Sequence, residues 1–214
     1  MGISYDGDGD RCHAVDENGE LLDGDILLAI FSKYLKAQGK LKKDTVVATV
    51  MSNLGLNKFG KAQGLILKQT KVGDRYVLEE MLKNDYNLGG EQSGHIILLD
   101  HNPTGDGILT SIMLIQILLK NKTELSKLKQ IMKIYPQVLI NAKVNNDKKE
   151  SYKQDEEIQE AISKIEEEFR DNGRVLIRPS GTESLVRVMI EGENQDYITQ
   201  KAKILVELIE KKLQ

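Results

Sequence analysis

An acidic loop near the start of the sequence combines three carboxylates and an arginine in the segment Asp6-Gly7-Asp8-Gly9-Asp10-Arg11. Carboxylates this close together repel one another unless a cation lies among them, and the glycines allow the loop to fold around one. Oxygen ligands of this kind suit Mg²⁺, which keeps part of its water shell and often bridges to a phosphate group. We therefore predict that Asp6, Asp8 and Asp10 bind Mg²⁺ and that Arg11 contacts the phosphate.

The spacing of the carboxylates also fits the calcium-binding loop of an EF-hand, with Glu17 as the final ligand. That loop requires glycine at its sixth position for a sharp turn, and Arg11 stands there instead. The flanking segments 2–5 and 12–15 have the pattern of strands rather than helices. The pattern therefore disfavours a calcium site and leaves a solvated acidic turn without a metal as the other alternative.

A second polar segment, Gly90–His95, precedes a predicted strand and carries three kinds of hydrogen-bonding side chain on a glycine-rich frame. Glu91 supplies a carboxylate, Ser93 a hydroxyl and His95 an imidazole. This set suits the hydroxyl groups of a sugar. The alternative for this segment is a polar β-turn without a ligand.

A third polar segment, Arg178–Glu183, joins two predicted strands. It supplies a guanidinium, two hydroxyls and exposed backbone N–H groups, from Arg178, Ser180, Gly181 and Thr182. These groups are typical of an anion-binding loop, and a phosphate is the natural ligand. Arg187 either adds its charge to this loop or forms a cross-strand ion pair with a glutamate.

A fourth candidate is the turn Lys71–Arg75, which opens a predicted helix. Backbone N–H groups at the start of a helix attract anions, and two cationic side chains flank this turn. The segment therefore adds Gly73, Asp74 and Arg75 to the candidate substrate-binding residues.

Composition excludes several classes of function. The 214 residues are 40% hydrophobic and 29% charged, with a formal net charge of −3, which gives no indication of nucleic-acid binding. No run of about 18 apolar residues and no signal-peptide pattern occurs, so we expect a cytoplasmic protein without a membrane partner. The single cysteine, Cys12, excludes an internal disulfide, and the three scattered histidines disfavour a zinc site. We interpret Cys12 and His13 as two strand residues whose side chains point to opposite faces.

Helix and strand patterns alternate after a predicted hairpin at residues 11–23. The predicted helices span residues 25–38, 53–63, 74–83, 106–120 and 124–132. The predicted strands span residues 45–51, 65–67 and 95–100. This alternation predicts parallel α/β packing, with Asp74 capping the third helix and the apolar helix 106–120 lying between two layers.

The pattern changes near residue 136. Two more helices follow, at residues 155–170 and 196–213, with strands at 137–144, 174–178 and 185–191. The sequence therefore predicts a three-layer mixed α/β domain followed by a smaller α+β domain, with the end of another α/β domain in front of both.

The three loops together resemble the α-D-phosphohexomutase family, whose metal, sugar and phosphate loops have the patterns D-G-D-x-D-R, G-E-x-S-G-H and R-P-S-G-T-E. All three occur here in the family's order, and the resemblance covers essentially the whole chain. It implies that residues 1–23 end the family's second domain, residues 24–136 form the third and residues 137–214 form the fourth. Nothing in the sequence matches the phosphoserine loop of the first domain, so we expect the C-terminal half of such an enzyme.

The resemblance also implies roles for the loops. Residues 51–55, Gln92 and residues 186–192 are most similar to members that interconvert hexosamine 6-phosphate and 1-phosphate through a bisphosphate. The metal loop would hold Mg²⁺, the catalytic residues would be Arg11 and His95, and Glu91 and Ser93 would bind sugar hydroxyls. A phosphate would be bound by Arg178, Ser180, Gly181, Thr182 and Arg187.

The expected partners are a hexosamine phosphate or bisphosphate and the missing N-terminal half of the enzyme. The strands of the partial second domain, separated from the rest of their sheet, leave an unpaired edge that favours self-association, so a homodimer is a further expected partner. We expect the chain alone to bind phosphosugar weakly without catalysing the reaction. Two alternatives remain: a relative acting on glucose or mannose phosphates, and a phosphosugar-binding protein that is not an enzyme.

Overall fold

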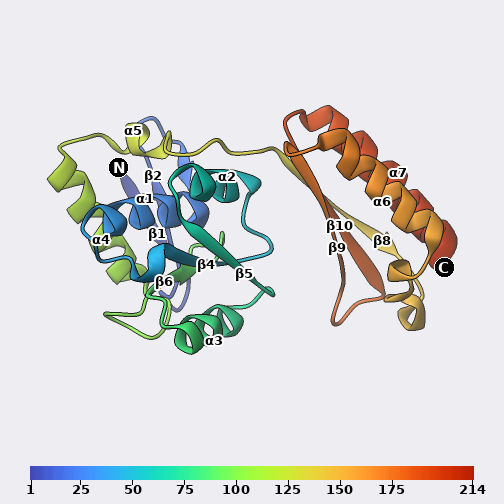
Figure 1. Ribbon diagram of the computed structural model, residues 1–214, viewed down its shortest axis with the longest axis horizontal. Helices are drawn as coiled ribbons and strands as arrows, with labels where there is room; N and C mark the ends of the chain where they lie inside the picture. Colours follow the sequence, from blue (N-terminus) through green and yellow to red (C-terminus); the bar gives the residue numbers. More distant parts are fainter. The chain divides into compact units, whose positions relative to one another are not determined.

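The computed structural model describes residues 1–214. These residues form two compact units, Met1–Ile134 and Tyr135–Gln214 (Figure 1). Each unit has its own hydrophobic core. No helix combines the length and the apolar character that crossing a membrane requires. The predicted hairpin packs within the first unit, and the predicted domain division at residue 23 stays a prediction.

The first unit begins with a small antiparallel sheet in the order β1-β2-β3. Its strands are β1 (Gly2–Tyr5), β2 (Cys12–Val15) and β3 (Leu21–Leu22). The Asp16 carboxylate closes the turn between β2 and β3, since it accepts hydrogen bonds from the backbone N–H groups of Asn18 and Glu20, both at 2.9 Å. The predicted hairpin is confirmed.

A four-stranded mixed sheet forms the centre of the first unit, in the order β5-β4-β6-β7. The strands are β4 (Thr45–Thr49), β5 (Ile66–Thr70), β6 (Leu88–Gly90) and β7 (Ile96–Leu98). β4 runs parallel to β5 and β6, and β7 runs antiparallel to β6. The sequence did not predict β6, because its two glycines and single leucine lack the β-branched residues by which strands are recognised.

Helices cover both faces of this sheet. The helices of the first unit are α1 (Gly24–Ala37), α2 (Leu54–Ala62), α3 (Asp74–Asn84), α4 (Gly107–Asn121) and α5 (Leu125–Lys129), with a short 3₁₀ turn at Lys42–Asp44. α3 packs on one face through Val77 and Met81, which meet Val47 of β4. α1 and α2 pack on the other face, so the three-layer mixed α/β fold is confirmed.

The helix that lies between layers is α1, and the prediction that the apolar helix at 106–120 does so was wrong. α1 is buried almost all round, because the mixed sheet covers one side and α4 with the small sheet covers the other. α4 instead leaves an apolar side exposed, formed by Ile108, Ile112, Ile115 and Leu119. A helix that is apolar on every side is usually buried. Its composition alone does not show whether that helix or a neighbouring one lies between the two sheets.

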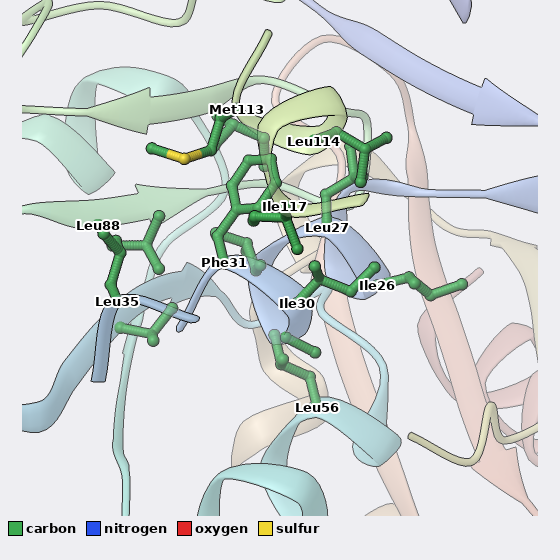
Figure 2. Close-up of a cluster of buried hydrophobic side chains, with 14 of the residues drawn as sticks. Ile26, Leu27, Ile30, Phe31, Leu35, Leu56, Leu88, Met113, Leu114 and Ile117 are labelled. Atoms are coloured by element: carbon green, nitrogen blue, oxygen red, sulfur yellow. The ribbon is translucent and has the colours of Figure 1, made fainter. Parts of the chain in front are cut away.

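The main core of the first unit surrounds α1 (Figure 2). Ile26, Leu27, Ile30 and Phe31 of α1 meet side chains from the surrounding elements. Those labelled in Figure 2 are Leu56, Leu88, Met113, Leu114 and Ile117, and Leu35 of α1 is labelled with them. This packing holds the start of α1, and with it the loops at that end of the sheet, in one rigid body.

Two predicted details of the helices were wrong. α3 begins at Asp74, but its N-cap is Gly73, and no side chain caps it. The helix predicted at 124–132 is only Leu125–Lys129, since the residues that follow have no further helical turn.

The second unit is a three-stranded antiparallel sheet in the order β8-β10-β9, with two helices packed on it (Figure 1). The strands are β8 (Gln137–Lys143), β9 (Gly173–Pro179) and β10 (Leu185–Gly192). The helices are α6 (Glu156–Phe169) and α7 (Gln195–Leu213), and two 3₁₀ turns, Asn146–Lys148 and Ser151–Lys153, precede α6. The predicted α+β domain is confirmed.

Candidate active site

The acidic loop connects β1 and β2 and gathers its three aspartates. One carboxylate oxygen from each of Asp6, Asp8 and Asp10 lies within 4.8 Å of the others. Desolvation opposes ionisation of Asp6, but the hydrogen bond from the Arg11 N–H and the nearby charge of Arg11 outweigh it, so the pKa of Asp6 is lowered. The loop therefore presents a cluster of three carboxylates.

The donor set fits a hard divalent cation. Asp6 and Asp8 are exposed, whereas Asp10 is partly buried. The Oδ1 atom of Asp10 is buried without a hydrogen bond, and its nearest cation is the Nε atom of Arg11 at 3.8 Å. A buried carboxylate oxygen without a donor is unfavourable, and coordination to Mg²⁺ would satisfy it.

Arg11 lies beside this cluster, with its Nε atom 3.6 Å from Asp6, and its side chain is 51% exposed. It lines a cavity of about 190 Å³ together with Ser4, Tyr5, Asp6, His13 and Ser93. The Oγ atom of Ser93 and the Nε2 atom of His13 are buried without hydrogen-bond partners. The wall of the cavity therefore carries a guanidinium and a carboxylate, and two polar atoms of its lining residues have no partner within the protein.

The predicted metal and sugar loops meet directly, although they are far apart in the sequence. Arg11 and His95 form an isolated antiparallel β-bridge, and the N–H of Cys12 donates to the carbonyl of Gly94 at 3.1 Å. The sugar loop also contacts the start of α1, because the N–H of Gly24 donates to the carbonyl of Gln92 at 3.0 Å. Both loops are therefore parts of one framework.

Gly94 allows this approach, and replacing it tests the arrangement. Its φ is +92°, and a Cβ atom there would lie 2.5 Å from the carbonyl oxygen of Cys12. We expect Gly94→Ala to lower the free energy of unfolding by about 1–3 kcal/mol more than Gly39→Ala does. Gly39 is the matched control because it has a φ of +66° but open space around the Cβ position. Equal losses in urea unfolding would contradict the close approach.

Cys12 is fully buried at this junction. Burial raises the pKa of its thiol to about 11, so the side chain is a neutral part of the core. Along β2 the burial alternates, with Cys12 buried and His13 half-buried. The interpretation of the two as ordinary strand residues is confirmed.

Glu91 connects the sugar loop to the start of α3. Its Oε1 atom accepts a hydrogen bond from the N–H of Gly73 at 3.1 Å. Asp74 is exposed, and Arg75 pairs with Glu79 on its own helix at 2.7 Å. The structure therefore brings Gly73 to the loop cluster and leaves the side chains of Asp74 and Arg75 at the surface.

His95 is enclosed rather than open to the cavity. Only 3% of its surface is exposed. Its Nδ1 atom lies 3.0 Å from Oδ2 of Asp10, and its Nε2 atom accepts a hydrogen bond from the N–H of Gly105 at 3.1 Å. Both ring nitrogens are thus engaged within the protein.

The segment before α4 supports the same cluster, and the sequence reasoning missed it. Gly105 contacts the ring of His95, and the N–H of Gly107 donates to the carbonyl of Gly9 at 2.9 Å. A Cβ atom at Gly107 would lie 2.6 Å from the carbonyl oxygen of Arg11. The sequence has a glycine on each side of Asp106, at the start of an apolar helix. This pattern could have predicted that the backbone here lies close to another segment.

The predicted phosphate loop connects β9 and β10 in the second unit. The N–H of Ser180 donates to the carbonyl of Leu185 at 2.9 Å, and the N–H of Glu183 donates to Oγ of Ser180 at 3.2 Å. Gly181 and Thr182 lie exposed between these bonds. The Ser180 side chain therefore shapes the loop, and the exposed tip offers Thr182 and backbone groups to a ligand.

Lys149 stabilises the same loop and was also missed. Its ammonium group donates to the carbonyls of Ser180 at 2.8 Å and of Glu183 at 3.4 Å. No local pattern marks this lysine, because the contact joins segments about thirty residues apart.

Two arginines lie side by side at the base of the loop. Arg178 and Arg187 are directly opposite each other in the β9–β10 register. Burial and the positive charge of Arg187 both lower the pKa of Arg178. Arg187 also lies 3.6 Å from Glu183, but Glu183 belongs to the connecting loop. The residues opposite Arg187 in the sheet are Arg178 and Asn141, so the predicted cross-strand pair with a glutamate is wrong. Like charges opposite each other are destabilising, which makes this pair suited to an anion.

Comparison with known proteins identifies the family. Residues 23–135 match the description "Phosphoglucomutase/phosphomannomutase, alpha/beta/alpha domain III", and residues 139–208 match the C-terminal domain of the same enzymes. The chain belongs to the phosphoglucomutase/phosphomannomutase family. The resemblance to phosphohexomutases is thereby confirmed.

Curated relatives in this family include phosphoglucosamine mutases. The enzyme of Ruminiclostridium cellulolyticum is 58% identical over 213 residues, which cover 100% of this chain and 47% of the relative. The enzyme of Clostridium acetobutylicum is 59% identical over 212 residues, covering 99% of this chain and 47% of the relative. The chain thus spans about half the length of the curated relatives it matches.

Solved structures of phosphohexomutases show the same fold. An N-acetylglucosamine-phosphate mutase in its product complex superposes with a TM-score of 0.77 at 22% identity, covering 97% of this chain and 48% of that one. Aspergillus fumigatus N-acetylphosphoglucosamine mutase, in complex with GlcNAc-6P and magnesium, gives 0.77 at 19% identity, covering 98% and 48%. The chain therefore shares its fold with an enzyme whose structure contains magnesium and a phosphosugar.

Proposed function

We propose that this chain is the C-terminal half of a phosphoglucosamine mutase, which interconverts glucosamine 6-phosphate and glucosamine 1-phosphate through a bisphosphate. The observation that carries the proposal is the direct junction of the aspartate loop with the sugar loop, through the Arg11–His95 bridge and the Cys12–Gly94 hydrogen bond. Asp6 of the aspartate loop, Arg11 and Ser93 line one cavity at this junction, which supports the proposal. The identity of 58% to a phosphoglucosamine mutase over the whole chain supports the choice of sugar.

The residues of the first unit have separate tasks in this proposal. Asp6, Asp8 and Asp10 hold Mg²⁺, which when bound neutralises the charge of a phosphate. Arg11 stabilises the phosphoryl group in transfer, since positioning and charge neutralisation are the main needs of this chemistry. Ser93 and Glu91 bind sugar hydroxyls, and the hydrogen bond from Gly73 keeps Glu91 in place.

The loop of the second unit binds a phosphate group that is not being transferred. Arg178 and Arg187 supply the charge, and Thr182 and the backbone of Gly181 supply hydrogen-bond donors. Because the loop is closed by its own bonds and by Lys149, it needs little reorganisation to accept a ligand.

The chain spans 47% of its curated relatives, so we propose that the remaining half supplies the phosphoserine. The isolated chain then binds bisphosphate without turnover. A cytoplasmic location and a possible homodimer stay predictions.

A calorimetric titration with glucosamine 1,6-bisphosphate in Mg²⁺ tests the proposal. We expect Arg178→Ala to weaken binding about tenfold to a hundredfold, because a hydrogen-bonded charge is lost. Lys203→Ala is the matched control, since Lys203 is an exposed cation of α7 outside the loop. Equal affinities of the Arg178 and Lys203 variants would contradict the phosphate assignment, and tighter binding of glucose or mannose bisphosphate would contradict the choice of sugar.

A further inference from the structure

We propose that His95 is a positioning residue for the aspartate loop, which orients the carboxylate of Asp10 for a divalent cation and does not itself touch the substrate. The inference rests on the proposed function, since it concerns the same loop. It reassigns the one imidazole of the sugar loop, which the sequence pattern associates with the sugar.

The first step is the proton on the ring. A backbone N–H can only donate, so the Nε2 atom that accepts from Gly105 carries no proton. A neutral imidazole has its proton on the other nitrogen, and here that is Nδ1, at 3.0 Å from Oδ2 of Asp10. His95 therefore donates its only N–H to the carboxylate.

The second step is the rigidity of the ring. A Cβ atom at Gly105 would lie 2.4 to 2.5 Å from Cε1, Nδ1 and Nε2 of His95, so the ring lies directly against the Gly105 backbone. The backbone of His95 is itself paired with Arg11, the residue that follows Asp10. Contacts with two segments therefore hold the imidazole in one orientation. The imidazole in turn restricts the orientation of the Asp10 carboxylate.

The third step is the consequence for Asp10. With Oδ2 bonded to His95, the carboxylate cannot rotate freely, and Oδ1 is left buried without a hydrogen bond. The two oxygens therefore differ in their surroundings: Oδ2 is held by His95, and Oδ1 has no hydrogen-bond partner in the protein and is the oxygen left to coordinate a cation. Metal-binding carboxylates commonly depend on such a supporting hydrogen bond, and losing one typically weakens metal affinity tenfold to a hundredfold.

Two substitutions separate the two bonds of the ring. The side-chain amide of His95→Asn retains a donor near the position of Nδ1 but reaches less far toward Gly105. The longer amide of His95→Gln reaches toward the position of Nε2, where its oxygen can accept from Gly105, and lacks the donor to Asp10. We expect Mn²⁺ affinity of the chain, measured by electron paramagnetic resonance, to fall about tenfold to a hundredfold in His95→Gln and much less in His95→Asn.

A second measurement needs no substitution and no metal. Nitrogen-15 NMR of the unsubstituted chain reports which ring nitrogen of His95 carries the proton, and we expect Nδ1. A proton on Nε2, or equal Mn²⁺ affinities of the two variants, would overturn the proposal. Unsubstituted chain that binds no Mn²⁺ would overturn it together with the metal assignment, whereas Arg178-dependent bisphosphate binding would still support the phosphate loop.

Discussion

Replacing Arg11 by alanine is expected to lower kcat about a hundredfold to a thousandfold in an enzyme that contains both halves. The guanidinium lies beside the aspartate cluster and lines the same cavity as Ser93, and in the proposed function it stabilises charge on a transferring phosphoryl group. KM should change much less, because in the proposed function the phosphate loop of the second unit binds the ligand without Arg11. Steady-state kinetics with glucosamine 6-phosphate, on this chain joined to the N-terminal half of a curated relative, measures both constants.

Arg11→Lys is the informative companion. Lysine keeps the charge but loses the planar fork that binds phosphate through two parallel hydrogen bonds. We expect its kcat to lie between those of the alanine variant and the unsubstituted enzyme. A kcat of Arg11→Ala within threefold of the unsubstituted value would contradict the role in transfer, and a loss confined to KM would assign Arg11 to binding alone.

Replacing Phe31 by alanine is expected to lower the free energy of unfolding of the first unit by about 3–5 kcal/mol. Phe31 is among the largest fully buried side chains and lies at the centre of the cluster around α1 (Figure 2). α1 is enclosed on both sides, so its neighbours can collapse little into the resulting cavity. Such a loss is a large part of the stability of a typical domain.

Urea unfolding followed by circular dichroism measures this loss, since the chain has no tryptophan for fluorescence. Leu119→Ala on the exposed side of α4 is the matched control, because Leu119 is 73% exposed. Its expected change is within about 0.5 kcal/mol. A similar small change for Phe31→Ala would mean that the cluster around α1 repacks freely.

Much of the site could be predicted because its residues lie in short, ordered segments. The alternation of Asp6, Asp8 and Asp10 indicates a cation cluster on chemical grounds alone, and the turn after Arg178 indicates an anion loop. The role of His95 could not be predicted in this way. Its contacts come from Asp10 and Gly105, and no spacing in the sequence reveals that an imidazole faces a carboxylate rather than a ligand.

The fold shows the same limit. β-branched runs such as Thr45–Thr49 identify the central strand, but the glycines of β6 conceal a strand that only its neighbours define. The apolar pattern of α4 predicted burial between layers, whereas α1 takes that place because the small sheet and α4 cover it. Local composition therefore predicts most of the helices and strands. Which helix the sheets enclose depends on contacts between segments that are far apart in the sequence.

The pairing of Arg178 with Arg187 has a consequence for the energetics of the second unit. Two guanidiniums opposite each other oppose folding of the hairpin, and only Glu183 lies close enough to offset one of them. The hairpin is therefore locally frustrated, in the sense that a neutral residue at either position would make the unit more stable and less able to bind an anion. The second unit therefore combines a less stable strand pair with a preformed positive potential. Substitutions at these two positions that stabilise the unit are expected to weaken its binding of an anion.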